Sequence, residues 1–202
     1  MTATTLAPVS WQRMKQGIEQ VRRRLERAAR ALREAGVPYA VVGGNAVAAW
    51  VSRVDTAAVR NTRDVDILLR RVDLERARAA LEAAGFVHRR VSSLGKAGTM
   101  DVFLDGPEAK VRDAVHVLWA GEKAVPDAIE PTPELGRTES AGTFELIPLE
   151  DLLRMKLTSF RDKDRMHLRD LAGVGLVDES WLARFPAALA ERLQMILADP
   201  EG

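Results

Sequence analysis

The spacing of apolar residues predicts a chain of helices and short strands. In residues 11–35, apolar residues recur at three- and four-residue steps, which predicts one long helix ended by Gly36. Residues 38–42 and 64–69 are short apolar runs, typical of buried strands. Further elements are expected at residues 45–51, 73–84, 86–91, 100–104, 114–119, 144–147, 149–159, 161–171 and 180–197. The order predicts an α/β fold: a mixed sheet flanked by helices, with a helical C-terminal extension.

A glycine pair stands between the first predicted strand and a small apolar helix. Gly43 and Gly44 follow the strand, and Asn45 opens the helix. Glycine permits positive φ angles and lets the backbone approach a ligand closely. Free backbone N–H groups at the start of a helix also attract anions. The sequence therefore predicts a turn that binds phosphate.

Two acids stand two positions apart on the second apolar strand. Asp64 and Asp66 point to the same face because side chains alternate along a strand, while Val65 and Ile67 point to the other. Neighbouring carboxylates repel each other, and a divalent cation relieves that repulsion. Mg²⁺ commonly takes one or two carboxylates together with phosphate oxygens. The acids therefore predict a Mg²⁺ site close to the glycine turn.

The glycine pair, the two acids and the segment Arg60–Arg63 before them together resemble the nucleotidyltransferase-fold family. The sequence looks most similar to the small bacterial branch, which holds the minimal nucleotidyltransferases and the AbiEii-type toxins. The resemblance implies a nucleotidyltransferase-like mixed sheet in which Asp64 and Asp66 bind Mg²⁺. The residues that it assigns to an NTP are Gly43, Gly44, Asn45, Arg63 and Lys156.

The sequence departs from the family pattern at the third acid, which serves there as a metal ligand or general base. His116 stands in the expected place, between Val115 and Val117. Asp101 also lies between apolar neighbours, but one strand earlier. A neutral imidazole is a good general base near neutral pH and a poor Mg²⁺ ligand. Three alternatives stay open: Asp101 serves, His116 replaces the acid, or the site works with two acids.

A lysine interrupts the apolar pattern of the predicted helix at 149–159. Lys156 matches the family's lysine that reaches toward the nucleotide, and Lys163, Asp164 and Asp170 follow it as in the family's later segment. By resemblance, Lys156 contacts the triphosphate or the base, and the later residues shape the site or join two helices through ion pairs. A buried lysine needs an anionic partner.

Composition narrows the possible chemistry. With 202 residues, 47% of them hydrophobic, the chain can bury a substantial core. It has no cysteine, which excludes disulfides, zinc thiolate sites and cysteine nucleophiles. Its 30 basic and 29 acidic residues give a net charge of +1, which does not indicate a globally basic surface. No run approaches the ~18 apolar residues of a membrane span, and no secretory signal is visible, so we expect a cytoplasmic protein without a membrane partner.

Arginines cover the remaining faces of the predicted helix at 11–35. They are Arg22, Arg23, Arg24, Arg27, Arg30 and Arg33. Such a face is usually solvated. The alternative is that these arginines bind a polyanion such as tRNA through its phosphates.

The sequence divides into an N-terminal helix (1–36), a nucleotidyltransferase-like core (37–122), and a crossing loop with a helical C-terminal part (123–202). We predict a Mg²⁺-dependent nucleotidyltransferase that moves an NMP from an NTP to a hydroxyl of RNA, protein or a small molecule and releases pyrophosphate. The AbiEii resemblance favours a toxin-like role, as in a toxin–antitoxin pair. The alternative is a catalytically degenerate protein of this fold that binds nucleotide, RNA or a partner. Oligomers are compatible with both.

Overall fold

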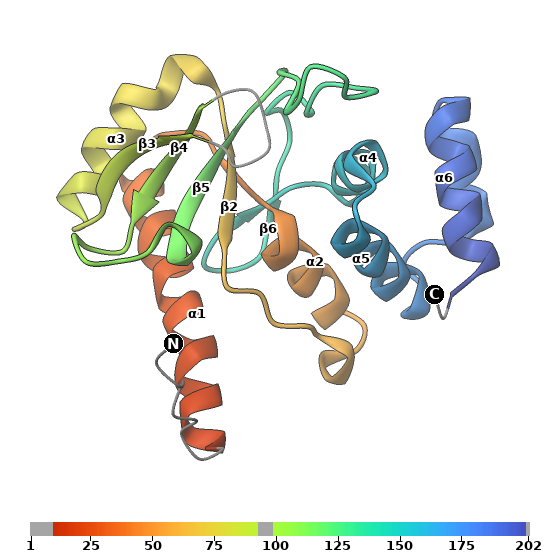
Figure 1. Cartoon of the computed structure of the whole chain (residues 1–202), viewed down its shortest axis with the longest axis horizontal. Helices are drawn as coiled ribbons and strands as arrows, with labels where there is room; N and C mark the ends of the chain where they lie inside the picture. The colour runs from red at the N-terminus through yellow and green to blue at the C-terminus, as the bar shows by residue number, and fades with distance from the viewer. Residues whose placement is uncertain (1–9, 93–98, 201–202) are drawn as a thin grey trace, which may run out of the picture.

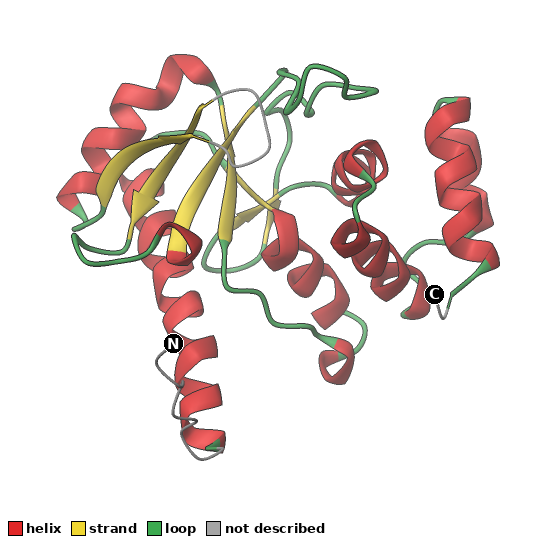
Figure 2. Ribbon diagram, in the orientation of Figure 1, coloured by secondary structure: helices red, strands yellow, loops and turns green. Residues whose placement is uncertain are grey.

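The computed structural model describes residues 10–92 and 99–200, in which helices cover both faces of one mixed sheet (Figure 1, Figure 2). The helices are α1 (Trp11–Glu34), α2 (Gly43–Ser52), α3 (Leu74–Ala83), α4 (Leu149–Ser159), α5 (Asp162–Gly173) and α6 (Ala187–Ala198). The strands are β1 (Ala40–Val42), β2 (Val65–Leu69), β3 (Val87–Ser92), β4 (Thr99–Leu104), β5 (Ala114–Trp119), β6 (Glu139–Ser140) and β7 (Glu145–Leu146). The predicted α/β fold class is confirmed.

The strand order places β2 at the centre of the sheet. The order is β3-β4-β5-β2-β1-β7-β6, with β2 parallel to β5 and antiparallel to β1. Strand β2 reads Val-Asp-Ile-Leu-Leu and is buried except at Asp66, which is partly exposed. A central strand has neighbours on both sides, so its backbone is fixed along its whole length. The second acid of the motif is therefore held in the most constrained part of the sheet.

Helices α1 and α3 cover one face of the sheet. Their apolar residues meet the side chains of Val65, Ile67, Phe103 and Val115, all buried. Alternation along β2 sends Val65 and Ile67 to this face and leaves Asp66 on the other. The alternation expected from the sequence is therefore what separates the core beneath α1 from the face that carries the acids.

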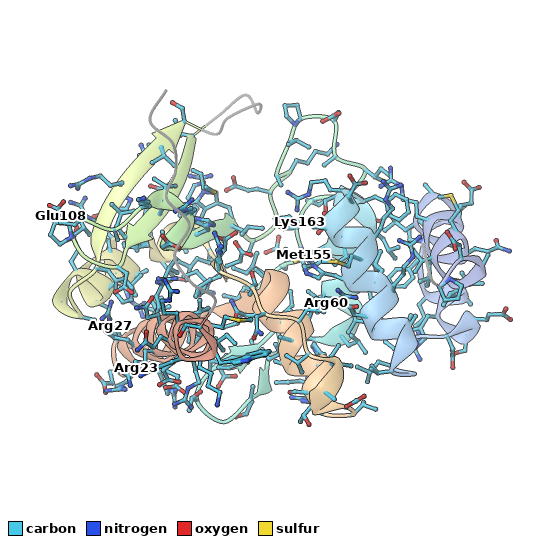
Figure 3. The ribbon with its side chains drawn as sticks, turned by 60° about the horizontal axis from the view of Figure 1, so that its bottom comes forward. Arg23, Arg27, Arg60, Glu108, Met155 and Lys163 are labelled. Carbon is cyan, nitrogen blue, oxygen red and sulfur yellow. The ribbon has the colours of Figure 1, made fainter. Side chains whose placement is uncertain are left out.

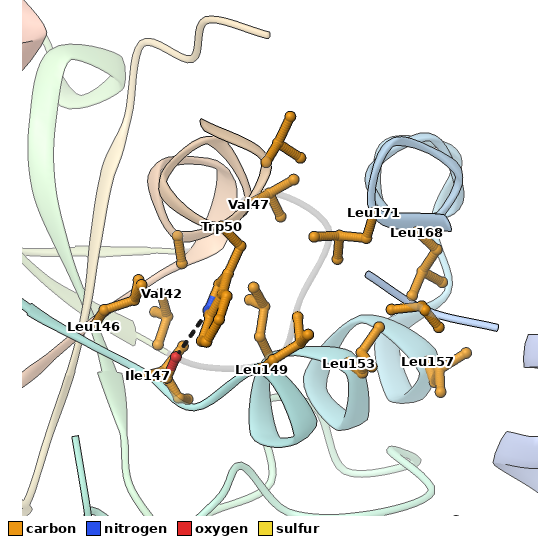
Figure 4. Packing of buried hydrophobic residues seen from close by; sticks show 14 of the residues in the cluster. Val42, Val47, Trp50, Leu146, Ile147, Leu149, Leu153, Leu157, Leu168 and Leu171 are labelled. Carbon is orange, nitrogen blue, oxygen red and sulfur yellow. Dashed lines mark hydrogen bonds between the residues drawn. The ribbon is translucent and has the colours of Figure 1, made fainter. Parts of the chain in front are cut away.

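Helices α2, α4, α5 and α6 cover the other face. They form the larger apolar cluster, in which Leu153, Leu157 and Leu168 are fully buried (Figure 4). Trp50 of α2 donates a hydrogen bond from its indole Nε1 to the carbonyl oxygen of Ile147, at 3.1 Å (Figure 4). This bond joins α2 to the segment that leads from β7 into α4. The C-terminal helices therefore pack on α2, the helix that begins with the glycine pair.

Helix α1 begins at an N-cap provided by Ser10, whose hydroxyl accepts a hydrogen bond from the Arg13 backbone N–H. Its C-terminal half packs on the sheet through buried residues that include Leu25 and Leu32. Its N-terminal half extends beyond the sheet, where residues 11–20 are exposed except for a partly buried Glu19 (Figure 1). No helix in the described ranges is both long enough and apolar enough to cross a membrane.

Two local expectations differ from the structure. The sequence predicts a turn at Gly43–Gly44 before a helix from Asn45, whereas α2 begins at Gly43 itself, with φ at +68°. The second difference is β6, which lies in the segment interpreted as an irregular crossing loop. It pairs with β7 at the edge of the sheet. A two-residue strand is too short to produce a periodic sequence signal.

We expect Trp50→Phe to lower the free energy of unfolding by about 1–3 kcal/mol, because the buried Ile147 carbonyl would lose its hydrogen-bond donor. Urea unfolding followed by circular dichroism measures this. The matched control is Trp181→Phe, since the Trp181 indole donates no hydrogen bond to any residue in 10–92 or 99–200, and we expect a smaller loss. An equal loss in both variants would contradict the role given to this bond.

Candidate active site

The Asp66 carboxylate lies on a row of side chains that crosses four strands. In this row, Asp66 pairs in register with Val42 of β1 and with His116 of β5, which in turn pairs with Val102 of β4. Residues paired in register share one face of the sheet. The apolar neighbours in the row are fully buried, whereas the Asp66 side chain is 22% exposed. Asp66 and His116 therefore form a polar strip between two apolar clusters.

Gly43, the first residue of α2, allows the Asp66 carboxylate to lie against the backbone. A Cβ atom added at Gly43 would be 2.0 Å from Asp66 Oδ2, and the glycine has a positive φ. Both the space and the backbone conformation therefore require glycine here. The next glycine, Gly44, leaves little room too, since a Cβ there would be 3.0 Å from Thr62 Cβ. The pair brings the N-terminus of α2 directly beside the second acid.

Asn45 holds the backbone of Asp64, the first acid of the motif, in place. Its side-chain amide Nδ2 donates a hydrogen bond of 2.6 Å to the carbonyl oxygen of Asp64. The Asp64 side chain is partly buried and makes no hydrogen bond or ion pair within the described ranges. The resemblance predicts that Asn45 binds the nucleotide, and the structure shows that its side chain also positions the Asp64 backbone. It leaves the Asp64 carboxylate available to a ligand.

His116 is held between a carbonyl and the Asp66 carboxylate. Its Nε2 lies 2.8 Å from the Val111 carbonyl oxygen, which can only accept, so this nitrogen carries a proton. Its Nδ1 lies 3.5 Å from Asp66 Oδ1. Burial lowers the pKa of His116, but Asp66, the Val111 carbonyl and Asp64 together raise it above its usual value. Nδ1 is therefore the atom of His116 that faces the acids.

Asp101, one of the alternatives for the third acid, lies on the face of the sheet opposite Asp66. It is the neighbour of Val102, which shares the face of His116, so Asp101 points to the opposite face. There its carboxylate is buried and lies 2.8 Å from His88 Nε2 and 3.4 Å from Arg90 Nε. The structure therefore does not bring Asp101 together with Asp66, and the acceptor-activating role expected of Asp101 stays a prediction that its placement does not support.

Lys156 is buried in an ion pair with Asp164, as a lysine on an apolar face requires. Its Nζ lies 3.0 Å from Asp164 Oδ1, and Asp164 also accepts from Ser159 and Arg161. Burial lowers the pKa of Lys156, against the opposing effects of Asp164 and Asp66. The pKa of Asp164 is held well below its usual value, since Arg161, Lys156 and Ser159 outweigh its burial. The pair joins α4 to α5 and puts positive charge within reach of Asp66.

The face of α5 toward the sheet carries further polar groups. Figure 3 labels Lys163 and Arg60 in the region between α5 and the sheet. Arg60 Nε lies 2.8 Å from Asp170 Oδ1, so this arginine pairs with α5 and does not neutralise Asp64. His167 Nδ1 and Asp170 Oδ2 are buried without a hydrogen-bond partner among the described residues. Sequence reasoning did not single out His167 as a site residue.

Arg24 is a second residue that sequence reasoning missed. The sequence placed Arg24 on a face that is either solvated or binds a polyanion. In the structure the residue is only 6% exposed. Its Nη1 donates to the Arg63 carbonyl oxygen at 3.1 Å, and its Nε lies 3.1 Å from Asp105 Oδ2. Arg24 thus ties α1 to the backbone immediately before Asp64, while the Arg63 side chain is exposed. Only the fold brings Asp105 to this helix.

The donor set at the acids fits Mg²⁺. The described ranges contain no group of three or more His, Asp or Glu side chains that could enclose a metal. Mg²⁺ does not need such a cage, since it is commonly held by one or two carboxylates, waters and substrate phosphates. Asp64, whose side chain has no partner among the described residues, and the partly exposed Asp66 would supply the carboxylates, and the start of α2 would supply N–H groups for phosphate. The residues present therefore match a metal that arrives with a nucleotide.

Comparison with known families decides the class of the protein. A family model described as "Uncharacterised nucleotidyltransferase" matches residues 9–123, which is more than half of the chain. The chain belongs to this nucleotidyltransferase family. The matched range holds the glycine pair, both acids and His116, whereas Lys156 and α5 lie outside it. The recognition made from Gly43–Gly44 and the two acids is confirmed. No curated protein matches the chain.

The chain is also similar to solved structures of two other proteins. The solution structure of the antibiotic-resistance factor ANT(2'')-Ia is 18% identical, with a TM-score of 0.51 over 90% of this chain and 91% of that one. The crystal structure of ANT(2'')-Ia with adenylyl-2''-tobramycin is 18% identical, with a TM-score of 0.43 over 90% and 97%. A nucleotidyltransferase-like antigen from Paracoccidioides brasiliensis is 17% identical, with a TM-score of 0.47 over 90% and 87%. At these identities, the first likeness shows the shared fold.

We expect Gly43→Ala to destabilise the fold by about 1–3 kcal/mol, because a non-glycine residue is strained at this φ. The added Cβ would also displace the Asp66 carboxylate. The matched control is Gly173→Ala at the last residue of α5, where an added Cβ meets nothing within 4 Å. Thermal unfolding of both variants measures the difference. Equal stability would show that Gly43 is not required sterically.

His167 should make stability depend on pH. Its pKa is lowered from 6.5 to about 4, first by burial and then by Lys156. Between these values the unfolded chain binds a proton that the folded chain does not, so the free energy of unfolding falls as the pH falls. We expect His167→Gln to flatten this dependence in urea unfolding at pH 7, 6 and 5, and Glu191→Gln on α6 to leave it unchanged. An unaltered slope in His167→Gln would contradict the assignment.

Proposed function

We propose that this protein is a Mg²⁺-dependent nucleotidyltransferase. It transfers an NMP from an NTP to a hydroxyl group and releases pyrophosphate. The observation that supports this most directly is the position of two carboxylates, Asp64 and Asp66, beside the N-terminus of α2 at Gly43. The membership in a nucleotidyltransferase family gives the class of reaction.

The residues around the acids suit a triphosphate. Asp64 and Asp66 would hold Mg²⁺, which neutralises charge on the triphosphate and on the departing pyrophosphate. The backbone N–H groups at Gly43 and Gly44 would receive phosphate oxygens, since the start of a helix attracts anions. We propose that Lys156 acts through its charge, because its ammonium group is already held by Asp164. In such a transfer the protein contributes mainly positioning and charge neutralisation.

His116 is the group placed to take the proton of the acceptor. The acceptor oxygen attacks the α-phosphorus, the bond from that phosphorus to the bridging oxygen of pyrophosphate breaks, and the hydroxyl proton leaves the acceptor. Asp101 faces the other side of the sheet, and Nε2 of His116 is occupied by the Val111 carbonyl. We propose that Nδ1 of His116, on the side of the acids, receives the proton.

The same histidine favours one second candidate, a protein of this fold that binds nucleotide without transferring it. A protonated His116 would neutralise Asp66 and compete with a cation for its carboxylate. The RNA-binding alternative receives less support from α1. There Arg22 and Arg23 both pair with Glu19, and Arg24 is buried.

Three acceptor classes fit the proposal: an RNA end, a protein side chain and a small molecule such as an aminoglycoside. All three offer a hydroxyl to the face that carries Asp64, Asp66 and His116. A toxin-like role would use RNA or protein, and the four NTPs are equally open as donors. The acceptor therefore has to be found by assay with one labelled NTP at a time.

The decisive comparison is between wild type, Asp64→Asn and the control Glu191→Gln on the far helix α6. Calorimetry with each NTP should show binding that needs Mg²⁺ in wild type and control, and no metal-dependent binding in Asp64→Asn. Transfer of an α-phosphate label should fall roughly a hundredfold or more in Asp64→Asn, because a metal ligand contributes several kcal/mol of charge stabilisation. Equal transfer in Asp64→Asn would refute the proposal. Binding without transfer in wild type would support the second candidate.

A further inference from the structure

The backbone of Asp64, the first acid of the motif, is not held by the sheet. Strand β2 begins one residue later, at Val65, which pairs in register with Val115 of β5. Among the residues that the structure describes, the backbone groups of Arg63 and Asp64 make no hydrogen bond to another backbone group. A metal ligand has to be held close to its productive geometry by the groups around it. Side chains therefore have to hold Asp64 if its carboxylate is to bind a cation.

Two side chains from opposite faces of the sheet hold the carbonyl groups that flank the Asp64 Cα atom. On one face, Asn45 of α2 donates from Nδ2 to the Asp64 carbonyl oxygen at 2.6 Å. On the other face, Arg24 of α1 donates from Nη1 to the Arg63 carbonyl oxygen at 3.1 Å. Both peptide groups on either side of this Cα atom are therefore fixed, whereas the Asp64 carboxylate makes no hydrogen bond or ion pair within the described residues.

The Arg24 guanidinium is itself held by Asp105, which lies just after β4. The Arg24 side chain is buried, and its Nε lies 3.1 Å from Asp105 Oδ2. Arginine presents its donors in a rigid planar fork, so one guanidinium can hold a carboxylate and a carbonyl group at once. Asp105 also pairs with Arg27, which makes no hydrogen bond to Arg63 in the described part of the chain. The bond to Arg63 is therefore what distinguishes Arg24 from the second arginine on the same carboxylate.

We propose that Arg24 is a positioning residue for the metal site. Through the Arg63 carbonyl group, it holds the Asp64 carboxylate where Asp64 and Asp66 can share one cation. This role rests on the proposed function, because it requires that Asp64 binds Mg²⁺. Groups that orient metal ligands typically change metal affinity by roughly 10- to 100-fold when they are mutated. An arginine that only packed α1 on the sheet would change stability and leave metal affinity as it is.

Binding of Mn²⁺ in the presence of a non-hydrolysable NTP, followed by electron paramagnetic resonance, tests the proposal without requiring transfer. We expect Arg24→Met to weaken Mn²⁺ affinity by roughly tenfold or more, and the matched control Arg27→Met to leave it unchanged. Asp105 keeps one arginine partner in each variant, so neither change leaves this carboxylate unpaired. Wild-type Mn²⁺ affinity in Arg24→Met overturns the proposal, as does an equal loss in both variants.

Arg24→Lys is a second variant, which keeps a positive charge at the buried position. The lysine ammonium group lacks the planar fork that holds Asp105 and the Arg63 carbonyl group together. We expect this variant to have the circular dichroism of wild type and a Mn²⁺ affinity that is still roughly tenfold lower. Wild-type affinity in a folded Arg24→Lys would show that charge alone is sufficient and would overturn the proposal.

The same titrations separate the role of Arg24 from the function on which it rests. A wild type that binds no Mn²⁺ with any of the four NTPs overturns both. A wild type that binds Mn²⁺ no better than the Arg24 variants overturns only the positioning role. Raising the Mg²⁺ concentration should restore transfer in Arg24→Met, whose two carboxylates are intact, and not in Asp64→Asn. Equal failure of both variants at high Mg²⁺ would contradict a role that acts through metal affinity.

Discussion

The close packing of the Asp66 carboxylate on the Gly43 backbone is the contact on which the rest of the site depends. It requires a glycine with positive φ at the start of α2 and an acid on the central strand β2. Once that contact is made, the helix N-terminus faces the strand, and Asn45 can reach the Asp64 carbonyl. The glycine pair and the strand that carries the acids therefore fit against each other and depend on each other sterically. A phosphate and a metal would meet where they join.

The charged side chains around this contact are held in place by burial as well as by ion pairs. Lys156 and Asp164 are buried together, so their ion pair fixes α4 against α5 and is little screened by solvent. Arg60, in the loop before the two acids, pairs with Asp170 on α5. Among the residues that the structure describes, the Asp64 side chain makes no hydrogen bond or ion pair, and Asp66 lies close to His116. Negative charge is thus concentrated at the one place where a cation would be bound.

Patterns that depend on neighbours in sequence were predictable here, and contacts between distant segments were not. Alternation along β2 correctly separated Asp66 from Ile67, and the apolar setting of Lys156 correctly required an anionic partner. Asp101 could not be assigned to a face without the register between β4 and β5. Arg24 could not be identified as buried without Asp105, which follows β4 and lies 81 residues later in the sequence. The placement of His116 opposite Asp66 came from the family pattern, and its hydrogen bond to Val111 came only from the fold.

The measurement that tests the central claim most directly is a crystal structure with a non-hydrolysable NTP and Mn²⁺, solved with anomalous data. Mn²⁺ takes the same oxygen ligands as Mg²⁺ and reveals its position by its anomalous signal. The account predicts one anomalous peak between the carboxylates of Asp64 and Asp66, with the triphosphate at the N-terminus of α2 beside Gly43 and Gly44. A nucleotide ordered elsewhere on the protein, with no metal at these two carboxylates, would contradict it.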